Sequence, residues 1–216
     1  MSKLKYKNKG VLYTILNNKF LVFLSNLIFQ GLRYMSFGEK IYKLIITLIF
    51  SLIFFQFFNV VYISLILGHL FNYIFNGQFY VVFRYLSSKR TMRYEDLFEF
   101  IKLINKFIKI FNPKDILIIG SFSKGKMGKS SDLDIRLYHD GSFIDSLKAY
   151  FMATLLRASG LYMKFPIDIF CFSDLHFLEK ISKDEIPVNF LKNVSFLEKY
   201  PTSQNYKSHL KKLIIT

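Results

Sequence analysis

The sequence of 216 residues contains one cysteine, Cys171, no tryptophan and only four prolines. A lone cysteine cannot close an intramolecular disulfide, so a disulfide-stabilised scaffold is excluded. Intrinsic disorder is also excluded, because 26 Phe and 14 Tyr supply ample apolar surface for burial. The length then allows one domain, or a small domain with an appendage.

Acidic residues are scarce as well, and they are unevenly placed. There are 15 Asp and Glu against 30 Lys and Arg, and the net charge of +15 accompanies a positive mean hydropathy of +0.27. Up to Lys43 there are eight basic residues and one acid, Glu39. The 40 residues from Leu44 to Phe83 contain no Asp, Glu, Lys or Arg. From Arg84 onward, 22 basic and 14 acidic residues are intermixed.

The uncharged block is typical of a membrane segment. A bilayer core of about 30 Å needs roughly 20 helical residues, so this block supplies two short spans. The first runs from Ile41 to Phe58, and the second from about Val60 to Phe83, with a turn signal at Asn76-Gly77. Basic residues on both flanks place both ends on the cytoplasmic side, as in a helical hairpin. The alternative is a very hydrophobic helical pair buried against a partner subunit.

Polar residues at the margins of the apolar segments indicate interfacial positions. The run from Val11 to Leu32 is interrupted near Asn18, so an amphipathic helix in the membrane interface suits it better than a span or a cleaved signal peptide. His69, Asn72 and Asn76 share one helical face. We interpret them as the interfacial end of the hairpin; the alternative is a site for a lipid headgroup or a partner membrane protein.

After Arg84 the pattern becomes that of an ordinary α/β domain, with alternating helix and strand signals. The expected elements are a helix over Tyr94–Phe111 ended by Asn112-Pro113, strands over Asp115–Ile119 and Leu133–Tyr138, a helix over Ser142–Ala158 ended by Ser159-Gly160, a strand over Leu161–Phe172 with Pro166 at a bulge or an edge, and a short helix over Asp174–Ile181 capped by Ser173.

The stretch from Gly120 to Asp134, GSFSKGKMGKSSDLD, carries the chemistry. A strand leads into Gly-Ser and a glycine- and lysine-rich loop, and Asp132 and Asp134 open the next strand. Their spacing puts both carboxylates on one face, where they repel each other unless a divalent cation lies between them. Mg²⁺ is the natural candidate, with Mn²⁺ as its substitute. Backbone N–H groups of the loop, the Ser121 hydroxyl and the Lys124 ammonium can hold phosphate oxygens.

A third carboxylate, Asp168, lies inside the apolar strand segment Ile167–Phe170. Burying an unpaired charge there would cost several kcal/mol, so a functional role is indicated. If this strand lies beside the one with Asp132 and Asp134, three carboxylates converge. Such a trio suits a two-metal site for in-line phosphoryl transfer.

These residues resemble the polymerase-beta-type nucleotidyltransferase superfamily, and most of all its small members, the minimal nucleotidyltransferases. The resemblance rests on Gly120-Ser121, Gly125, Ser131-Asp-Leu-Asp134 and the later Asp168, and it covers roughly residues 115 to 172. It implies a mixed sheet with flanking helices, Mg²⁺ dependence, and transfer of a nucleoside monophosphate from a nucleoside triphosphate with release of pyrophosphate. One departure is Lys124, where small members usually carry Arg; the charge is kept but the bidentate fork is lost.

The sequence therefore predicts three parts: a basic interfacial segment (1–40), a transmembrane helical hairpin (41–83) and an α/β nucleotidyltransferase-like domain (84–216). The expected sites are catalytic and metal-binding Asp132, Asp134 and Asp168, and nucleotide-binding Gly120, Ser121, Lys124 and Ser131. We expect a multi-pass membrane protein with a cytoplasmic catalytic domain that uses ATP or another NTP and a hydroxyl acceptor, such as a lipid-linked sugar or polysaccharide precursor. The alternatives are a non-catalytic nucleotide-binding scaffold for a membrane enzyme and a protein-modifying, toxin–antitoxin-like transferase. Nucleic acid is the weaker partner, because the densest basic cluster lies beside the apolar block.

Overall fold

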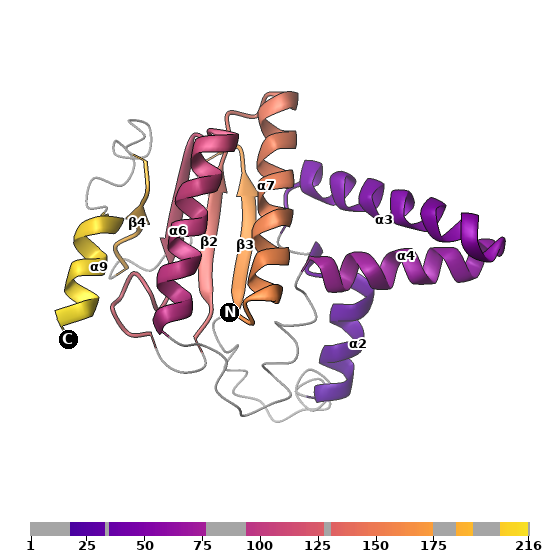
Figure 1. Cartoon of the computed structure of the whole chain (residues 1–216), viewed down its shortest axis with the longest axis horizontal. Helices are drawn as coiled ribbons and strands as arrows, with labels where there is room; N and C mark the ends of the chain where they lie inside the picture. The colour runs from indigo at the N-terminus through magenta and orange to yellow at the C-terminus, as the bar shows by residue number, and fades with distance from the viewer. Residues whose placement is uncertain are drawn as a thin grey trace, which may run out of the picture.

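The chain folds into an α/β domain with a helical hairpin that projects from one side of it (Figure 1). The structure is a computed structural model, and it describes residues 18–32, 35–76, 94–127, 131–174, 185–191 and 204–215. In chain order the elements are α2 (Lys19–Phe29), α3 (Phe37–Phe58), α4 (Val61–Phe75), α6 (Tyr94–Phe111), β1 (Asp115–Ile119), β2 (Leu133–Tyr138), α7 (Phe143–Tyr162), β3 (Ile167–Phe172), β4 (Val188–Asn189), β5 (Gln204–Asn205) and α9 (Tyr206–Ile215).

The sheet is mixed and has the strand order β3-β2-β1-β4-β5. The pairs β1–β2 and β1–β4 are antiparallel, whereas β2–β3 and β4–β5 are parallel. The parallel β2–β3 pair is joined by α7, a crossover helix of the kind that parallel strands require. The predicted class, a small mixed sheet with flanking helices, is confirmed.

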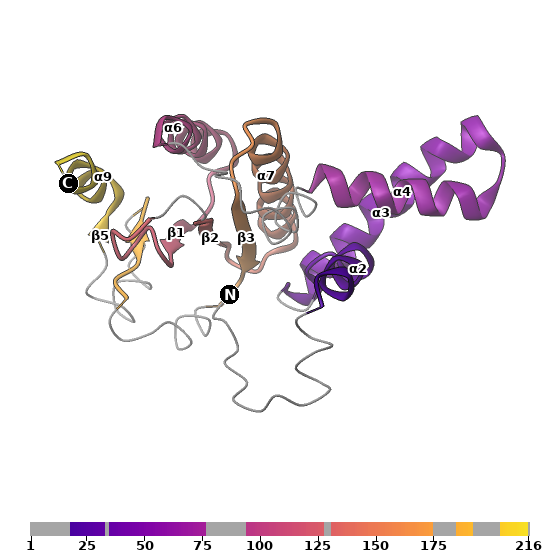
Figure 2. The ribbon, with the colours of Figure 1, turned by 90° about the horizontal axis from the view of Figure 1, so that it is seen from below.

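Helices α6 and α7 both lie over one face of the sheet (Figure 2). Leu133, Ile135 and Leu137 of β2 are fully buried beneath them, as period-two alternation requires. The core also contains Phe100 and Ile104 of α6, because the apolar residues of that helix recur every three or four positions. The alternate residues of β2 and β3 point to the opposite face, which is where the predicted carboxylates lie.

Helices α3 and α4 form a helical hairpin that reverses at Asn59, which adopts a left-handed conformation with φ 51°. Their axes come close because Gly68 lies against Ser51: a Cβ added at Gly68 would stand 2.6 Å from the Ser51 backbone nitrogen. Close approach at small residues is how helices pack in membranes. Among the described residues, α3 is the one helix long and apolar enough to cross a membrane, while α4 is apolar but shorter.

The polar face of α4 is turned inward. The Asn72 side chain donates to the carbonyl of Lys43 (3.2 Å) and to Thr47 Oγ1 (2.7 Å) on α3. His69 and Gln30 are hydrogen-bonded, and His69 Nε2 also lies 2.7 Å from the Leu27 carbonyl oxygen. These polar groups therefore join α2, α3 and α4 to one another rather than facing outward.

Two predicted boundaries were wrong, and both errors have the same cause. The sequence predicts that Ser159-Gly160 ends the helix and that a strand begins at Leu161, but α7 continues to Tyr162 and β3 begins at Ile167. Gly160 is needed for packing and not for a turn, because a Cβ there would stand 2.7 Å from Ile167 Cδ1. The left-handed residue that follows the helix is Lys164, with φ 53°.

Three other predicted elements of the α/β domain agree with the structure. The ranges Tyr94–Phe111, Asp115–Ile119 and Leu133–Tyr138 are found as predicted. Within the predicted interfacial segment, α2 begins at Lys19 with Asn18 as its N-cap. Residues 1–17, 77–93 and most of the predicted helix Asp174–Ile181 lie outside the described residues.

Candidate active site

The site is organised by two carboxylates on neighbouring parallel strands. Asp134 of β2 lies directly opposite Asp168 of β3 in the strand register. Both side chains leave the face of the sheet that α6 and α7 do not cover, because their neighbours Ile135 and Ile169 fill the core. Asp132 precedes Asp134 by two residues, just before β2 begins. The sequence left open whether the Asp168 strand lies beside the Asp132–Asp134 strand, and in the structure the two strands are paired.

The electrostatics of this group disfavour three ionised carboxylates. The pKa of Asp134 is raised to about 7, mainly by burial and then by the nearby charges of Asp132 and Asp168, against the opposing effect of Arg136. The pKa of Asp168 is also raised, first by burial and then by Asp132. Carboxylates that raise one another's pKa in a partly buried place are typical of functional sites.

Arg136 lies close to the pair, on the same face of β2. Its guanidinium is 3.9 Å from Asp134 Oδ1, donates to the backbone carbonyl of Asp168 (3.3 Å) and lies over the Phe170 ring, 5.0 Å from the centroid. It therefore bridges β2 and β3 beside the carboxylates. A single charge at that distance does not neutralise the group, since the pKa of Asp134 stays raised.

Gly120 provides room for the Asp134 carboxylate. It follows β1 with φ 77°, a conformation that favours glycine, and it lies next to Asp134 because Ile119 pairs with Asp134 in the β1–β2 register. A Cβ at Gly120 would clash with Asp134 Oδ2. The glycine of the motif is thus required twice, once by the turn and once by the approach of the carboxylate.

The loop after Gly120 turns tightly on itself. The N–H of Lys126 donates to the Ser121 carbonyl (2.9 Å), and that of Gly125, which has φ 64°, donates to the Phe122 carbonyl (3.0 Å). Phe122 anchors the loop: its side chain is fully buried, and its carbonyl oxygen lies 2.7 Å from His209 Nε2 of α9. Ser121 is partly exposed and lies at the end of the sheet where the carboxylates are found.

Glu185, which sequence reasoning missed, closes the loop from the other side. Its carboxylate accepts hydrogen bonds from the Gly120 N–H and from the Ser123 hydroxyl (3.3 Å), and it lies 3.3 Å from Lys124 Nζ. Lys124 therefore contributes less positive charge to a substrate than its sequence position suggests. No motif surrounds Glu185, so the sequence holds no signal that would have identified it.

The chemistry of the donors fits a hard divalent cation such as Mg²⁺, because Asp132, Asp134 and Asp168 offer oxygen ligands only and repel one another. Their side chains do not converge as they stand: within the described ranges no three His, Cys, Asp or Glu side chains are grouped closely enough to hold a metal ion. The Asp134 carboxylate is directed at Gly120. Joint binding of a cation therefore requires rotation of these side chains.

The remaining predicted residue, Ser131, is partly exposed and adjacent to Asp132, separated from the loop by residues 128–130, which lie outside the description. All seven predicted site residues thus belong to the β1–β2 loop, the start of β2 and β3. Arg136 was also missed, although the period of two that links Asp132 and Asp134 points directly to it.

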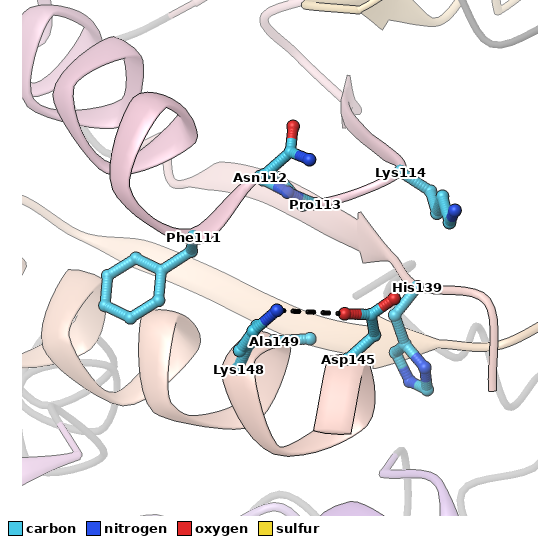
Figure 3. A pocket seen from close by; sticks show the side chains of 8 residues that line it. All are labelled: Phe111, Asn112, Pro113, Lys114, His139, Asp145, Lys148 and Ala149. Carbon is cyan, nitrogen blue, oxygen red and sulfur yellow. Dashed lines mark hydrogen bonds and ion pairs between the residues drawn. The ribbon is translucent and has the colours of Figure 1, made fainter. Parts of the chain in front are cut away.

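A small pocket lies elsewhere, at the end of the sheet remote from the carboxylates (Figure 3). It is lined by residues that include Lys114, His139 and Lys148, and the β1–β2 register places Tyr138, next to His139, opposite Asp115. Lys148 forms an ion pair with Asp145 (3.3 Å) and Lys114 one with Asp140 (3.6 Å). Its cations are therefore already paired with acids, and it takes no part in the site described above.

Comparison with known proteins agrees with this geometry. The family model described as "Nucleotidyltransferase domain" matches residues 100–213, more than half of the chain. No curated protein and no solved structure matches the chain significantly. The matched range contains the β1–β2 loop, all three carboxylates and Glu185, and it excludes the hairpin.

Proposed function

The chain belongs to the nucleotidyltransferase domain family, and we propose that it transfers a nucleoside monophosphate from an NTP to a hydroxyl acceptor at a membrane. In this reaction the acceptor oxygen bonds to the α-phosphorus, the bond from that phosphorus to pyrophosphate breaks, and the hydroxyl proton is released. The single observation that carries the proposal is the placement of Asp134 opposite Asp168, with the pKa of each carboxyl raised.

Three carboxylates would hold the metal ions. Asp132 and Asp134 would bind the Mg²⁺ that accompanies the triphosphate, and Asp168 would join them around a second ion. When bound, the ions neutralise charge on the phosphates and lower the pKa of the acceptor hydroxyl. The buried setting of Asp134 and Asp168 makes their ionised forms costly without a cation, so binding of a cation would release protons from these carboxyls.

The loop from Gly120 to Gly125 would position the triphosphate. Ser121 follows Gly120, the residue that lies against the Asp134 carboxylate, and Lys124 supplies a positive charge that Glu185 holds near the loop. Because Glu185 also accepts the Gly120 N–H, the loop keeps its shape without a bound phosphate. Such preorganisation lowers the cost of ordering the site when substrate binds.

The hairpin supports membrane attachment. From Leu44 to Phe58 and from Val61 to Phe75 its outward side chains are apolar and exposed, among them Leu48, Leu52 and Phe57, the last with 78% of its surface exposed. An exposed apolar surface of this extent on two long helices is expected in contact with lipid or a partner. Lipid is favoured because basic residues flank the segment on both sides in sequence.

An acceptor at the membrane follows from this attachment. The hairpin projects from the side of the domain where α7 lies (Figure 1), and Glu39 at its base contacts the backbone of β3, the edge strand that carries Asp168, so the site is held near the membrane surface. A lipid-linked sugar or a polysaccharide precursor with a free hydroxyl is the class of acceptor that such a placement serves.

The test is incubation of the full-length protein in detergent with α-labelled NTPs, Mg²⁺ and membrane extract. We expect pyrophosphate release and label in the lipid fraction, both lost in an Asp132→Ala/Asp134→Ala double variant. Label on protein instead would indicate a protein hydroxyl as acceptor. Equal behaviour of the wild type and the double variant, with no pyrophosphate released, would overturn the enzymatic proposal.

A further inference from the structure

The first turn of α3 is embedded in the α/β domain instead of standing clear of it. Gly38 lies so close to α7 that a Cβ there would clash with the Tyr150 hydroxyl, and the ring of Tyr42 stacks obliquely on that of Tyr150 at 5.7 Å. Between these two contacts lies Glu39, which is the single acid in the first 83 residues and has only 1% of its surface exposed.

Glu39 forms an ion pair with Arg157 of α7. The Arg157 guanidinium donates to Glu39 Oε1 at 2.5 Å, and both side chains are more than nine-tenths buried. A buried charge needs a partner with good geometry, since removal of one member leaves the other without compensation. The pair is therefore expected to fix the position of α3 relative to α7.

Both members of the pair also bind the backbone of β3. Glu39 Oε2 accepts the Cys171 N–H (3.2 Å), and Arg157 donates to the Ile169 carbonyl. Strand β3 is the edge of the sheet, so these outward backbone groups have no neighbouring strand to pair with. The ion pair thus provides hydrogen-bond partners for two backbone groups at the edge of β3, which a neighbouring strand would otherwise supply.

These contacts lie next to Asp168. Its own carbonyl accepts from Arg136 on the inner side of the strand, and the next carbonyl, that of Ile169, accepts from Arg157 on the outer side. The backbone that carries the third carboxylate is consequently held between two arginines. One of them is anchored to the apolar hairpin through Glu39.

We propose that Glu39 is a positioning residue that couples the membrane hairpin to the active site, by fixing β3 so that Asp168 faces Asp134. The inference rests on the proposed function, and it gives the hairpin a second role besides attaching the protein to the membrane. Helix α3 thereby helps to position the active site, and a shift of its first turn is transmitted to Asp168 through the Glu39–Arg157 pair.

The test compares the full-length protein with Glu39→Gln, Arg157→Lys and the double variant Glu39→Gln/Arg157→Gln. The double variant removes both members of the pair, so neither is left buried without the other, and it is expected to fold even if Glu39→Gln alone does not. Lys40→Gln is the matched control, because Lys40 is the next residue of α3 and is partly exposed. The readouts are amide hydrogen exchange of β3, Mn²⁺ affinity followed by electron paramagnetic resonance, and kcat and KM for NTP.

In the folded Glu39 variants we expect faster exchange in β3 with β1 unchanged, and Mn²⁺ affinity and kcat reduced roughly 10–100-fold, as is usual when support behind a metal ligand is lost. KM for NTP should change much less, because the Gly120–Gly125 loop is held by Glu185 and Phe122. Lys40→Gln should match the wild type. Unchanged Mn²⁺ affinity and unchanged β3 exchange in the folded double variant would overturn the inference. An inactive wild type with Glu39-dependent β3 exchange would instead count against the proposed function alone.

Discussion

Asp134 and Asp168 face each other across two parallel strands, although 33 residues lie between them in the chain. Parallel strands cannot be joined by a tight turn, so α7 must cross the sheet between them. That crossover places two carboxylates of one face in register. Because these like charges lie close together and are partly removed from water, we expect the site to bind cations and to respond to pH.

The raised pKa of Asp134 predicts a gain in stability when its charge is removed. For a carboxyl whose folded-state pKa is about 7, against 3.8 when unfolded, the stability present below about pH 4 is progressively lost as the pH rises towards 7. The Asp134→Asn variant has no carboxyl group to ionise at this position, so it does not lose this stability as the pH rises. Without Mg²⁺, its advantage over the wild type should grow by about 2 kcal/mol between pH 5 and pH 8, as measured by urea unfolding.

The control for this comparison is Glu99→Gln, which removes an exposed acid that pairs with Lys102. It should change stability little at either pH. Added Mg²⁺ should stabilise the wild type and leave Asp134→Asn nearly unaffected, since ligand binding to the folded state alone raises stability. A parallel pH dependence of the wild type and Asp134→Asn would contradict the assignment.

Gly120→Ala and Gly141→Ala form a matched pair. Both residues have positive φ, 77° and 87°, so alanine should cost about 1–2 kcal/mol at either position. At Gly141 the added Cβ meets only Ser173 Cβ at 3.5 Å, whereas at Gly120 it collides with the Asp134 carboxylate. We expect Gly141→Ala to keep pyrophosphate release and Gly120→Ala to lose it. Equal activity in both variants would show that Asp134 does not need the space above Gly120.

Gly68→Ala should loosen the hairpin. Its Cβ would stand 2.6 Å from the Ser51 backbone nitrogen, so α3 and α4 must separate, at a cost of about 1–3 kcal/mol. Thermal unfolding of the full-length protein in detergent measures this cost. Leu65→Ala, an exposed position on the same helix, is the control and should unfold close to the wild type. A wild-type transition in Gly68→Ala would argue against the close crossing.

The length of the hairpin predicts a preference for thin bilayers. From Leu44 to Phe58 the free part of α3 is about 22 Å long, as is α4, against a hydrocarbon core of about 30 Å. The tip cannot stop inside the core, because the backbone groups at the helix ends around Asn59 need polar partners, and the N-cap of α4, Val60, supplies no side-chain bond.

Partition of the protein into phosphatidylcholine vesicles should therefore decrease as the acyl chains lengthen. A variant with both helices extended by one leucine-rich turn should shift its optimum to longer chains, since each turn adds about 5.4 Å. Partition that is independent of chain length, or that rises with it, would contradict a crossing hairpin.

Local signals were sufficient for most of the elements that the structure describes. Helix α6 was predictable because its apolar residues repeat every three or four positions and Asn112-Pro113 ends it. Asp132, Asp134 and Asp168 stood out because charged residues in apolar strands are costly unless they have a function. Gly160 led to a wrong prediction of the end of α7, because a glycine required for close packing on Ile167 looks the same in the sequence as one that ends a helix.

The sequence by itself determined the uncharged block, the placing of basic residues on its flanks, and the alternation that puts Asp132 and Asp134 on one face. Those features depend only on composition and on the periods of helix and strand. The tertiary structure alone decided that Glu39 reaches Arg157 and β3, that Glu185 closes the loop, and that Arg136 bridges two strands. Such contacts join residues 32 to 132 positions apart, and only packing, through burial and the pairing of buried charge, selects them.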